Sequence, residues 1–312
     1  MGDKTLPEPP MRALKLRSPS LPAAPEIAFP AQPLRHLDAL WIQVAGTLCN
    51  LTCTHCFVSA GPANHRHALM SRDEVATRVA EGLELGVKEL YFTGGEPFLH
   101  PEMSEILGDN LALAPCTVLT NGTRFTPALL GRLRELSAAS RYSLELRVSL
   151  DGASPQDHDA FRGHGAFSRV MEGLRRCEAH GLLPIATVTQ TDESDPVRFC
   201  ERWLQLLRSH GVRRPRLKRI PLFRLGREAT RTRAYLPAET LAGLAPEAFD
   251  ETRLQCGSCR AVTARGVYPC PLLVEEPGGR MGDTLEEARA PFELRHGACY
   301  TCYVTGMTCG NG

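Results

Sequence analysis

The chain has 312 residues, of which 43% are apolar and 23% charged, as expected for a globular protein with one large and one smaller domain. Lys and Arg number 36 against 35 Asp and Glu, so a net charge of +1 gives no general attraction to nucleic acid or anionic membranes. The sequence has no secretory signal and no apolar run long enough to span a membrane, which predicts a cytoplasmic protein.

The chain is rich in cysteine, with twelve residues of this type. Thiols stay reduced in the cytoplasm, so clustered cysteines favour metal binding over disulfides. Residues 1–37 differ from the rest because they hold eight prolines and no periodic apolar pattern. This composition predicts a mostly disordered N-terminal arm.

Residues 38–225 alternate between strand and helix patterns. Strands are predicted at 38–47, 88–95, 117–122, 143–152, 183–191 and 216–223. Helices are predicted at 71–86, 101–112, 126–137, 167–181 and 196–211, the first opened by the capping box "SRDE". Such alternation predicts parallel βαβ units, and six of them form an α/β fold, a partial (β/α)6 TIM-like barrel with its chemistry at the carboxyl ends of the strands.

The pattern changes in residues 226–312, where a helical piece is expected at 237–248 and cysteines become dense. We expect a small cysteine-rich module here. Its six cysteines are Cys256, Cys259, Cys270, Cys299, Cys302 and Cys309.

The stretch "CNLTCTHCF" follows the first strand directly and places Cys49, Cys53 and Cys56 in a C-x3-C-x2-C pattern. Three thiolates can hold three corners of a [4Fe–4S] cube and leave one iron open for an external chelate. The alternative is a zinc loop whose fourth ligand is a histidine. The candidates for that ligand are His55, His65 and His67.

The second strand ends in "TGGEP", residues Thr93 to Pro97. Gly94 and Gly95 would let a ligand approach the backbone closely, and the Glu96 carboxylate can bind a cationic amine. The simpler interpretation is a turn followed by a helix that starts at Pro97. A cysteine loop and this turn at consecutive strand ends favour a shared binding site.

These motifs, with "VLTNGT" (118–123), "VSLDG" (148–152) and "FRGHGAF" (161–167), resemble the radical S-adenosylmethionine (SAM) enzymes over residues 40–310. The resemblance implies that the open iron chelates the amino and carboxylate groups of SAM. An electron from an external donor of the flavodoxin or ferredoxin type then leads to a 5′-deoxyadenosyl radical, which abstracts hydrogen from a substrate.

The resemblance also implies roles for individual residues. Cys49, Cys53 and Cys56 would ligate the cluster, and the turn at Gly94, Gly95 and Glu96 would hold the SAM amine. Further SAM contacts are implied for polar residues at the strand ends and one aromatic against adenine. These are Thr93, Asn121, Ser149, Asp151, Arg162 and Phe57, with Thr189 and Gln190 as residues that either face the cofactor or are half-buried strand positions.

The C-terminal cysteines follow C-x2-C-x10-C and C-x2-C-x6-C patterns, and two C-x2-C pairs are also typical of a zinc ribbon. The segment "ARGVYPC" resembles the hairpin of SPASM and twitch modules, with slightly different spacing. That resemblance implies at least one auxiliary [4Fe–4S] cluster on Cys259, Cys270, Cys299 and Cys302. A second, incomplete cluster using Cys256 and Cys309 stays open, and Cys256, Cys259 and Cys270 also resemble the auxiliary site of the molybdopterin-pathway cyclase.

Residues 212–233 hold nine Arg or Lys and one acid, Glu228, which suits an anionic substrate, an acidic partner or a solvated face. The near-neutral total charge argues against nucleic acid. We expect an oxidising or maturase-type radical SAM enzyme acting on a small biosynthetic metabolite or a peptide side chain. The missing leader-binding domain favours a small molecule or a peptide brought by a partner. The alternatives are a molybdopterin-cyclase-like enzyme and a non-catalytic zinc or iron–sulfur protein.

Overall fold

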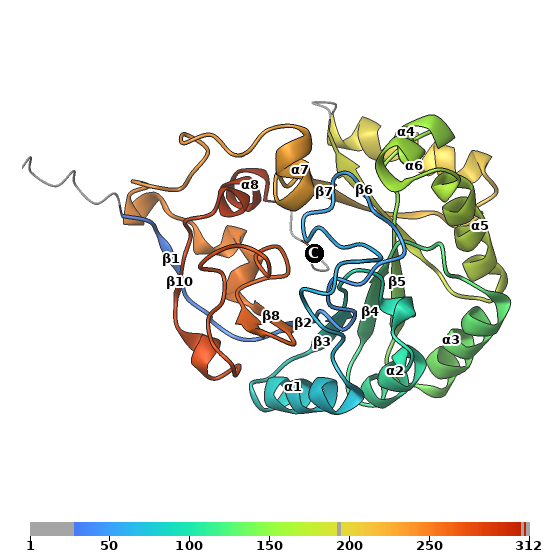
Figure 1. Ribbon diagram of the computed structural model, residues 1–312, viewed down its shortest axis with the longest axis horizontal. Coiled ribbons are helices and arrows are strands. Elements are labelled where there is room, and N and C mark those ends of the chain that lie inside the picture. The colour runs from blue at the N-terminus through green and yellow to red at the C-terminus, as the bar shows by residue number, and fades with distance from the viewer. Residues whose placement is uncertain (1–27, 192–194, 307–308, 310–312) are drawn as a thin grey trace, which may run out of the picture.

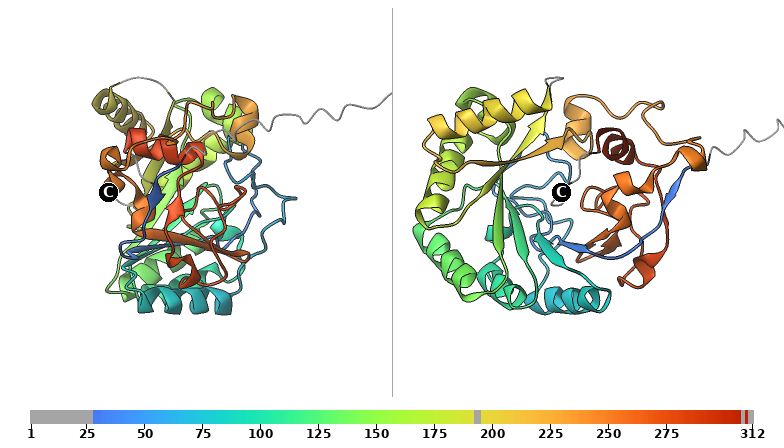
Figure 2. Two further views of the ribbon diagram at one scale, coloured as in Figure 1. Left: turned by 90° about the vertical axis from the view of Figure 1, so that its left-hand side faces the viewer. Right: turned by 180° about the vertical axis from the view of Figure 1, so that it is seen from behind.

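The computed structural model describes residues 28–191, 195–306 and 309. Its centre is an eight-stranded sheet with the order β7-β6-β5-β4-β3-β2-β8-β9, curved into a partial barrel with helices on its outer face (Figures 1 and 2). Six neighbouring strands are parallel, as the alternating pattern predicts. They are β2 (Ala39–Ile42), β3 (Glu89–Phe92), β4 (Cys116–Thr120), β5 (Leu144–Ser149), β6 (Ile185–Gln190) and β7 (Arg216–Pro221).

The five predicted helices are present and connect these strands. They are α1 (Arg72–Glu84), α2 (Met103–Leu111), α3 (Pro127–Ala139), α5 (Ala166–Ala179) and α6 (Pro196–Ser209). The capping box is formed, because the Ser71 hydroxyl accepts from the Glu74 N–H while the Glu74 carboxylate accepts from the Ser71 N–H at 2.7 Å. Among the described residues of the barrel, one helix is additional to the prediction: α4 (Pro155–Arg162) follows β5 and carries a predicted site residue.

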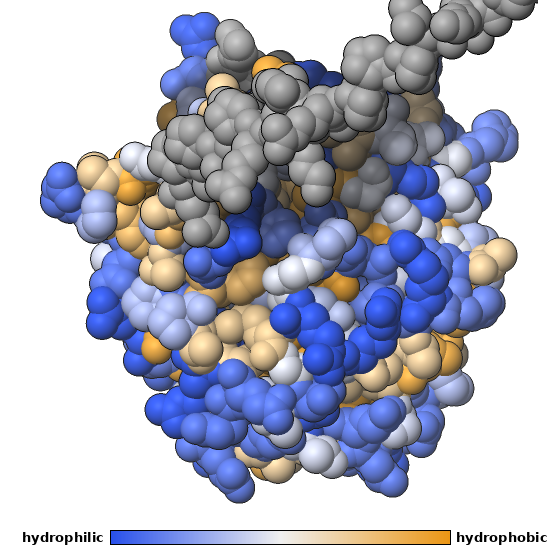
Figure 3. Space-filling model, turned by 60° about the vertical axis from the view of Figure 1, so that its left-hand side comes forward, coloured by the Kyte–Doolittle hydropathy of each residue, from blue (hydrophilic) through white to orange (hydrophobic). Residues whose placement is uncertain are grey.

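The sheet has apolar side chains on both faces. Leu40, Ile42 and Phe92 belong to the large core under the helices. On the concave face, the Trp41 and Tyr91 rings stack at 4.1 Å. On the outside of the molecule, the face in Figure 3 is mostly hydrophilic, with smaller apolar areas between. Because both faces of the sheet are buried, the strands are held rigidly, and so are the loops at their ends that carry the cysteine and glycine motifs.

The C-terminal region is continuous with the barrel sheet. Strand β8 (Cys259–Thr263) pairs in parallel with β2, and β9 (Gly266–Tyr268) pairs antiparallel with β8. Two helices, α7 (Gly226–Arg231) and α8 (Gly297–Thr305), complete the region with short 3₁₀ helices. The 3₁₀ helices of the described residues are Pro97–Leu99, Pro246–Ala248, Glu251–Arg253, Gln255–Gly257 and Glu287–Arg289.

Two expectations are corrected here. Residues 237–248 are not a helix but turns ending in one 3₁₀ helix, since Pro237, Gly243 and Pro246 interrupt it. The predicted disordered arm is ordered from residue 28, because β1 (Ala31–Gln32) pairs with β10 (Phe292–Glu293). Residues 1–27 of that arm lie outside the described residues. Among the described helices, none has the length and apolarity needed to cross a membrane.

Candidate active site

The cysteine loop after β2 and the glycine turn after β3 are held directly against each other. The Gly95 N–H donates to Gly46 O at 2.9 Å, and the Glu96 N–H donates to Leu48 O at 2.9 Å. A Cβ on Gly95 would lie 1.9 Å from Leu48 O, and Gly94 has a φ of +126°. Glycine is therefore required here by the contact between two backbone segments.

Two thiols of the loop, Cys49 and Cys53, are buried next to polar groups, and Cys56 is half-buried. Cys49 Sγ accepts from the Leu51 N–H at 3.4 Å and lies 3.8 Å from Asn121 Nδ2. Arg162 Nη1 lies 4.0 Å from Cys53 Sγ. Burial raises the pKa of Cys49 to about 11; the hydrogen bond from the Leu51 N–H opposes this shift, and repulsion by Glu96, Cys53 and Cys56 contributes to it. Thiolates at this position therefore need a cationic partner.

Three sulfur donors on one loop match the ligand chemistry of an iron–sulfur cluster, in which each thiolate bonds a different iron. Within the described residues, no three His, Cys, Asp or Glu side chains form a binding site for a single metal ion. The histidines proposed as a fourth zinc ligand are placed elsewhere. His55 pairs with Asp151, His67 pairs with Glu275, and His65 is exposed.

The Glu96 carboxylate is fully buried and joins the ends of β3 and β4. It accepts from Thr120 Oγ1 and the Asn121 N–H, both at 2.7 Å, and from the Phe98 N–H at 3.2 Å. Burial raises its pKa, although these hydrogen bonds oppose the shift. The predicted contact with a SAM amine stays a prediction, since the carboxylate already has three donors.

Asp151 and Arg162, both predicted, lie together after β5. Asp151 Oδ2 accepts from Arg162 Nε and pairs with His55 Nε2 at 3.1 Å, while Oδ1 accepts from Thr189 Oγ1 at 3.1 Å. Burial alone would raise the pKa of Asp151, but Arg162 and His55 lower it well below its usual range. The ion pair points Arg162 toward Cys53. Ser149 lies half-buried at the end of β5. The side-chain oxygen of Gln190 accepts a hydrogen bond from Arg219 Nη1.

Arg227 of α7 is a site residue that the sequence patterns did not reveal. Its guanidinium donates to Cys53 O at 2.7 Å, Ser59 O at 3.0 Å and Ala60 O at 2.6 Å. Gly226 has a φ of +51°, and a Cβ there would lie 2.3 Å from Phe57 O. One arginine thus fixes three carbonyls of the cysteine loop.

In the sequence, Arg227 was indicated only as one of the basic residues in 212–233. The basic side chains of this stretch do not all lie in solvent, and they do not form one continuous binding surface. Several of its arginines pair with acidic residues of the protein, although Arg216 and Arg233 are themselves exposed. The pairs are Arg216–Glu145, Arg224–Glu239, Arg231–Glu228 and Arg233–Glu239.

Comparison with known proteins decides the family. Residues 44–195 match the model of the radical SAM superfamily. These residues, just under half of the chain, are a radical SAM domain. It is 36% identical over 140 residues to the AdoMet-dependent heme synthase of Methanosarcina barkeri, covering 43% of this chain and 37% of that one. It is 32% identical over 154 residues to the GTP 3′,8-cyclase of Peptoclostridium acidaminophilum, covering 48% and 46%.

The matched segment therefore spans less than half of the length of either relative. Solved structures show the same fold at low identity. Streptococcus suis SuiB bound to the precursor peptide SuiA matches with a TM-score of 0.61 at 15% identity, covering 90% of this chain and 72% of that one. The anSMEcpe structure with bound AdoMet matches with a TM-score of 0.56 at 19% identity, covering 80% and 79%. The radical SAM family implies a [4Fe–4S] cluster and SAM as cofactors.

A cavity of about 270 Å³ opens beside the glycine turn of this radical SAM domain. Its barrel side is formed by Trp41, Gln43, Phe57, Thr93 and Gly94, and its other side by residues of the C-terminal region. Three predicted cofactor residues, Phe57, Thr93 and Gly94, thus line one space.

A second cavity, of about 520 Å³, lies within the C-terminal region and is lined mainly by apolar residues and thiols. Five of the six C-terminal cysteines line it: Cys256, Cys270, Cys299, Cys302 and Cys309. Cys259, the first residue of β8, is not among the lining residues; its thiol donates to Pro269 O at 3.5 Å and lies near the thiols of Cys270, Cys256 and Cys309. Burial raises the pKa of Cys270 to about 11 and that of Cys256 to about 12.

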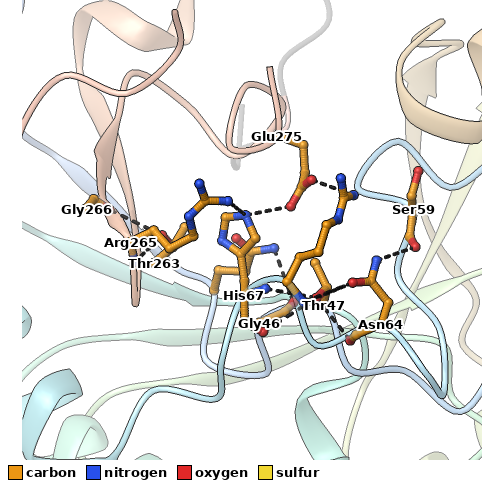
Figure 4. A network of polar contacts seen from close by, with 11 residues as sticks. Gly46, Thr47, Ser59, Asn64, His67, Thr263, Arg265, Gly266 and Glu275 are labelled. Atoms are coloured by element: carbon orange, nitrogen blue, oxygen red, sulfur yellow. Dashed lines mark hydrogen bonds and ion pairs between the residues drawn. The ribbon is translucent and has the colours of Figure 1, made fainter. Parts of the chain in front are cut away.

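A polar network connects the C-terminal region to the segment after the cysteine loop (Figure 4). Glu275 pairs with His67 Nε2 at 2.6 Å and with Arg66 at 2.6 Å, and Arg265 Nη1 lies 3.4 Å from the same His67 nitrogen. The Thr47 hydroxyl and Asn64 continue the network toward the loop. The two cysteine-bearing parts are therefore held in a fixed relation.

Proposed function

We propose that this radical SAM protein oxidises a small biosynthetic metabolite or a peptide side chain, with Cys49, Cys53 and Cys56 as ligands of its [4Fe–4S] cluster. When bound, the cluster and SAM supply a 5′-deoxyadenosyl radical that abstracts hydrogen from the substrate. The observation that carries this proposal is the cysteine loop packed on the glycine turn, beside the cavity at Phe57, Thr93 and Gly94.

The chain's own residues position the cofactor. The backbone at Gly94 and Gly95 receives the amine of SAM, and Glu96 keeps that turn in place through Thr120 and Asn121. Arg162 supplies positive charge beside Cys53 and is oriented by Asp151, so it suits the SAM carboxylate or ribose. Ser149 and Asn121 add polar contacts at neighbouring strand ends, and Phe57 offers a face for adenine. Arg227 holds the loop carbonyls so that the thiols keep their spacing.

The C-terminal cavity suits an auxiliary [4Fe–4S] cluster. Cys270, Cys299 and Cys302 are retained from the sequence prediction, and Cys256 replaces Cys259 as the fourth ligand because its side chain lines the cavity. Cys309 is a fifth thiol on the same cavity. A cyclase-like site would instead use Cys256, Cys259 and Cys270, whose thiols are also neighbours. Electrons enter from a flavodoxin- or ferredoxin-type donor in the cytoplasm.

The auxiliary assignment is tested with a matched pair of variants. Cys256→Ala should lower the iron content of anaerobically reconstituted protein by about four per chain, while Cys259→Ala should keep it. Protein carrying both Cys299→Ala and Cys302→Ala should still form 5′-deoxyadenosine from SAM, provided circular dichroism shows that it is folded. Equal iron loss in Cys256→Ala and Cys259→Ala would contradict the ligand choice, and zinc in place of iron would support the zinc-ribbon alternative.

A further inference from the structure

The concave face of the barrel carries cations deep below the cofactor residues. Ser149 of β5 pairs in register with Thr187 of β6, and Thr187 pairs with Lys218 of β7. Register partners in a sheet share a face, and residues two apart on one strand do as well. Arg147 therefore lies on the same face as Ser149, Thr187 and Lys218, whereas Leu146 and Val148 enter the core under the helices.

Arg147 is almost fully buried, at 2% exposure. Its Nε lies 3.3 Å from Glu145 Oε1, and its guanidinium carbon lies 5.5 Å from the centre of the Tyr91 ring. Its Nη1 donates to the main-chain carbonyl of Cys309 at 2.6 Å. The guanidinium therefore already binds one sp² oxygen from inside the barrel.

The charges around Arg147 do not balance. Glu145 is shared between Arg147 and Arg216, which binds its other oxygen at 3.0 Å. Lys218 is half-buried, and the described part of the chain gives its ammonium no hydrogen-bond or ion-pair partner. Within that part, one carboxylate thus faces three cations, of which Arg216 is exposed to solvent whereas Arg147 is buried and Lys218 half-buried. A buried cation without an anion is costly, so this site is suited to an anionic ligand.

A hydroxyl without a partner completes the site. Thr187 Oγ1 is buried and has no hydrogen-bond partner among the described residues. It lies in the sheet between the positions of Ser149 and Lys218. Buried hydroxyls are normally satisfied, so a ligand oxygen is the partner it lacks.

We infer that Arg147, Lys218 and Thr187 bind a carboxylate group of the substrate inside the barrel. The inference rests on the proposed function and gives the substrate a chemical class, a carboxylate-bearing metabolite or peptide. One negative charge offsets the unpaired Lys218, and a planar carboxylate fits the guanidinium fork that already holds the Cys309 carbonyl. The hydrogen to be abstracted then belongs to a carbon held above this group, toward Ser149.

The chain has only four lysines, Lys4, Lys15, Lys88 and Lys218, which allows a direct test. We would dimethylate them with a ¹³C label and follow their NMR signals in the anaerobic, cluster-loaded full chain with SAM. Sodium acetate and inorganic phosphate are the probes, titrated separately at constant pH and ionic strength. Lys218→Arg identifies the Lys218 signal. Lys88 is an internal control, because it is exposed and pairs with Asp38 at 2.7 Å.

Acetate should move the Lys218 signal along a saturating curve and leave the Lys88 signal in place. Arg147→Gln should weaken acetate binding about tenfold, as loss of a charge-assisted hydrogen bond does, and Thr187→Val about fivefold. Arg132→Gln, at an exposed helix position, should change nothing. Thr187→Val keeps the test valid if Arg147→Gln fails to fold.

Several results would overturn the inference. The first is a Lys218 signal that does not shift with acetate or phosphate. The second is an acetate-dependent shift that is unchanged in Arg147→Gln and Thr187→Val. The third is phosphate binding as tight as acetate binding. If Cys309→Ala alone moves the Lys218 signal as far as saturating acetate does, the chain's own thiol is the partner. Wild-type protein that binds acetate but never cleaves SAM contradicts only the proposed function, and protein that cleaves SAM without responding to acetate contradicts only this inference.

Discussion

Glu96→Gln tests whether the buried carboxylate joins the ends of β3 and β4. The carboxylate accepts from three donors: Thr120 Oγ1, the Asn121 N–H and the Phe98 N–H. Glutamine has the same shape but only one oxygen, and its amide group is itself a donor. In either orientation of the amide, at least one backbone N–H would face it and lose its acceptor.

The magnitude follows from that lost acceptor. A buried donor left unsatisfied costs about 1–3 kcal/mol, so the free energy of unfolding should fall by about this amount. Burial raises the pKa of Glu96 above 4.5, so the folded protein binds this proton more tightly than the unfolded chain. The stability this gives is complete below pH 4.5 and is lost as the pH rises through the raised pKa. Glutamine does not titrate, so Glu96→Gln does not lose this stability. The difference in unfolding free energy between wild type and variant should therefore become smaller as the pH rises.

The assay is urea unfolding of the anaerobic protein across pH, together with SAM binding by equilibrium dialysis. Glu84→Gln is the control, because Glu84 is an exposed residue of α1. Equal stability of Glu96→Gln and Glu84→Gln would refute the structural role. If SAM affinity fell by one or two decades with stability unchanged, the carboxylate would instead meet the SAM amine, as the sequence motif predicts.

Two further variants test the packing of the cysteine loop. Gly95→Ala places a Cβ 1.9 Å from Leu48 O, so it should lower both the melting temperature and the amount of iron bound by the loop. Gly131→Ala is the control, because no atom lies near its Cβ, and equal effects of the two variants would contradict the packing argument. Arg227→Lys leaves one ammonium where a guanidinium bonded three carbonyls, so iron should be released to a chelator several-fold faster than from wild type. Arg132→Lys serves as its control, and an unchanged release rate in Arg227→Lys would show that this contact is dispensable.

Local patterns predicted the barrel well because the residues that determine each helix and strand lie within that element or next to it in the sequence. The Ser71–Glu74 capping box and the apolar strands starting near Ala39 and Glu89 fix helix and strand without distant partners. The site motifs were also visible, since Cys49 and Gly95 lie in short stretches just after strands and Arg162 lies in the short motif FRGHGAF. Helix α4 was missed because PQDHDAFR is short and mostly polar.

The remaining features depend on contacts between distant segments. Strand β8 extends the sheet because Cys259 pairs with Ala39, more than 200 residues earlier, and no local pattern records this. Cys259 itself is not among the residues that line the cavity, although its thiol lies near those of Cys270, Cys256 and Cys309. Arg227 looked like one more cation in a basic stretch until the fold placed it on the carbonyl of Cys53.

The central claim is that Cys49, Cys53 and Cys56 hold the cluster on which SAM cleavage depends. The most direct test compares wild type with a triple Cys→Ala variant at these positions, after anaerobic reconstitution and reduction with dithionite, by iron content and 5′-deoxyadenosine formed from SAM. The control is a triple variant at Cys116 and Cys177, which are buried in the core, and Cys200, which packs against it. The loop variant should lose about four irons and all SAM cleavage, while the control keeps both. A loop variant that retained its iron and still formed 5′-deoxyadenosine would contradict the assignment.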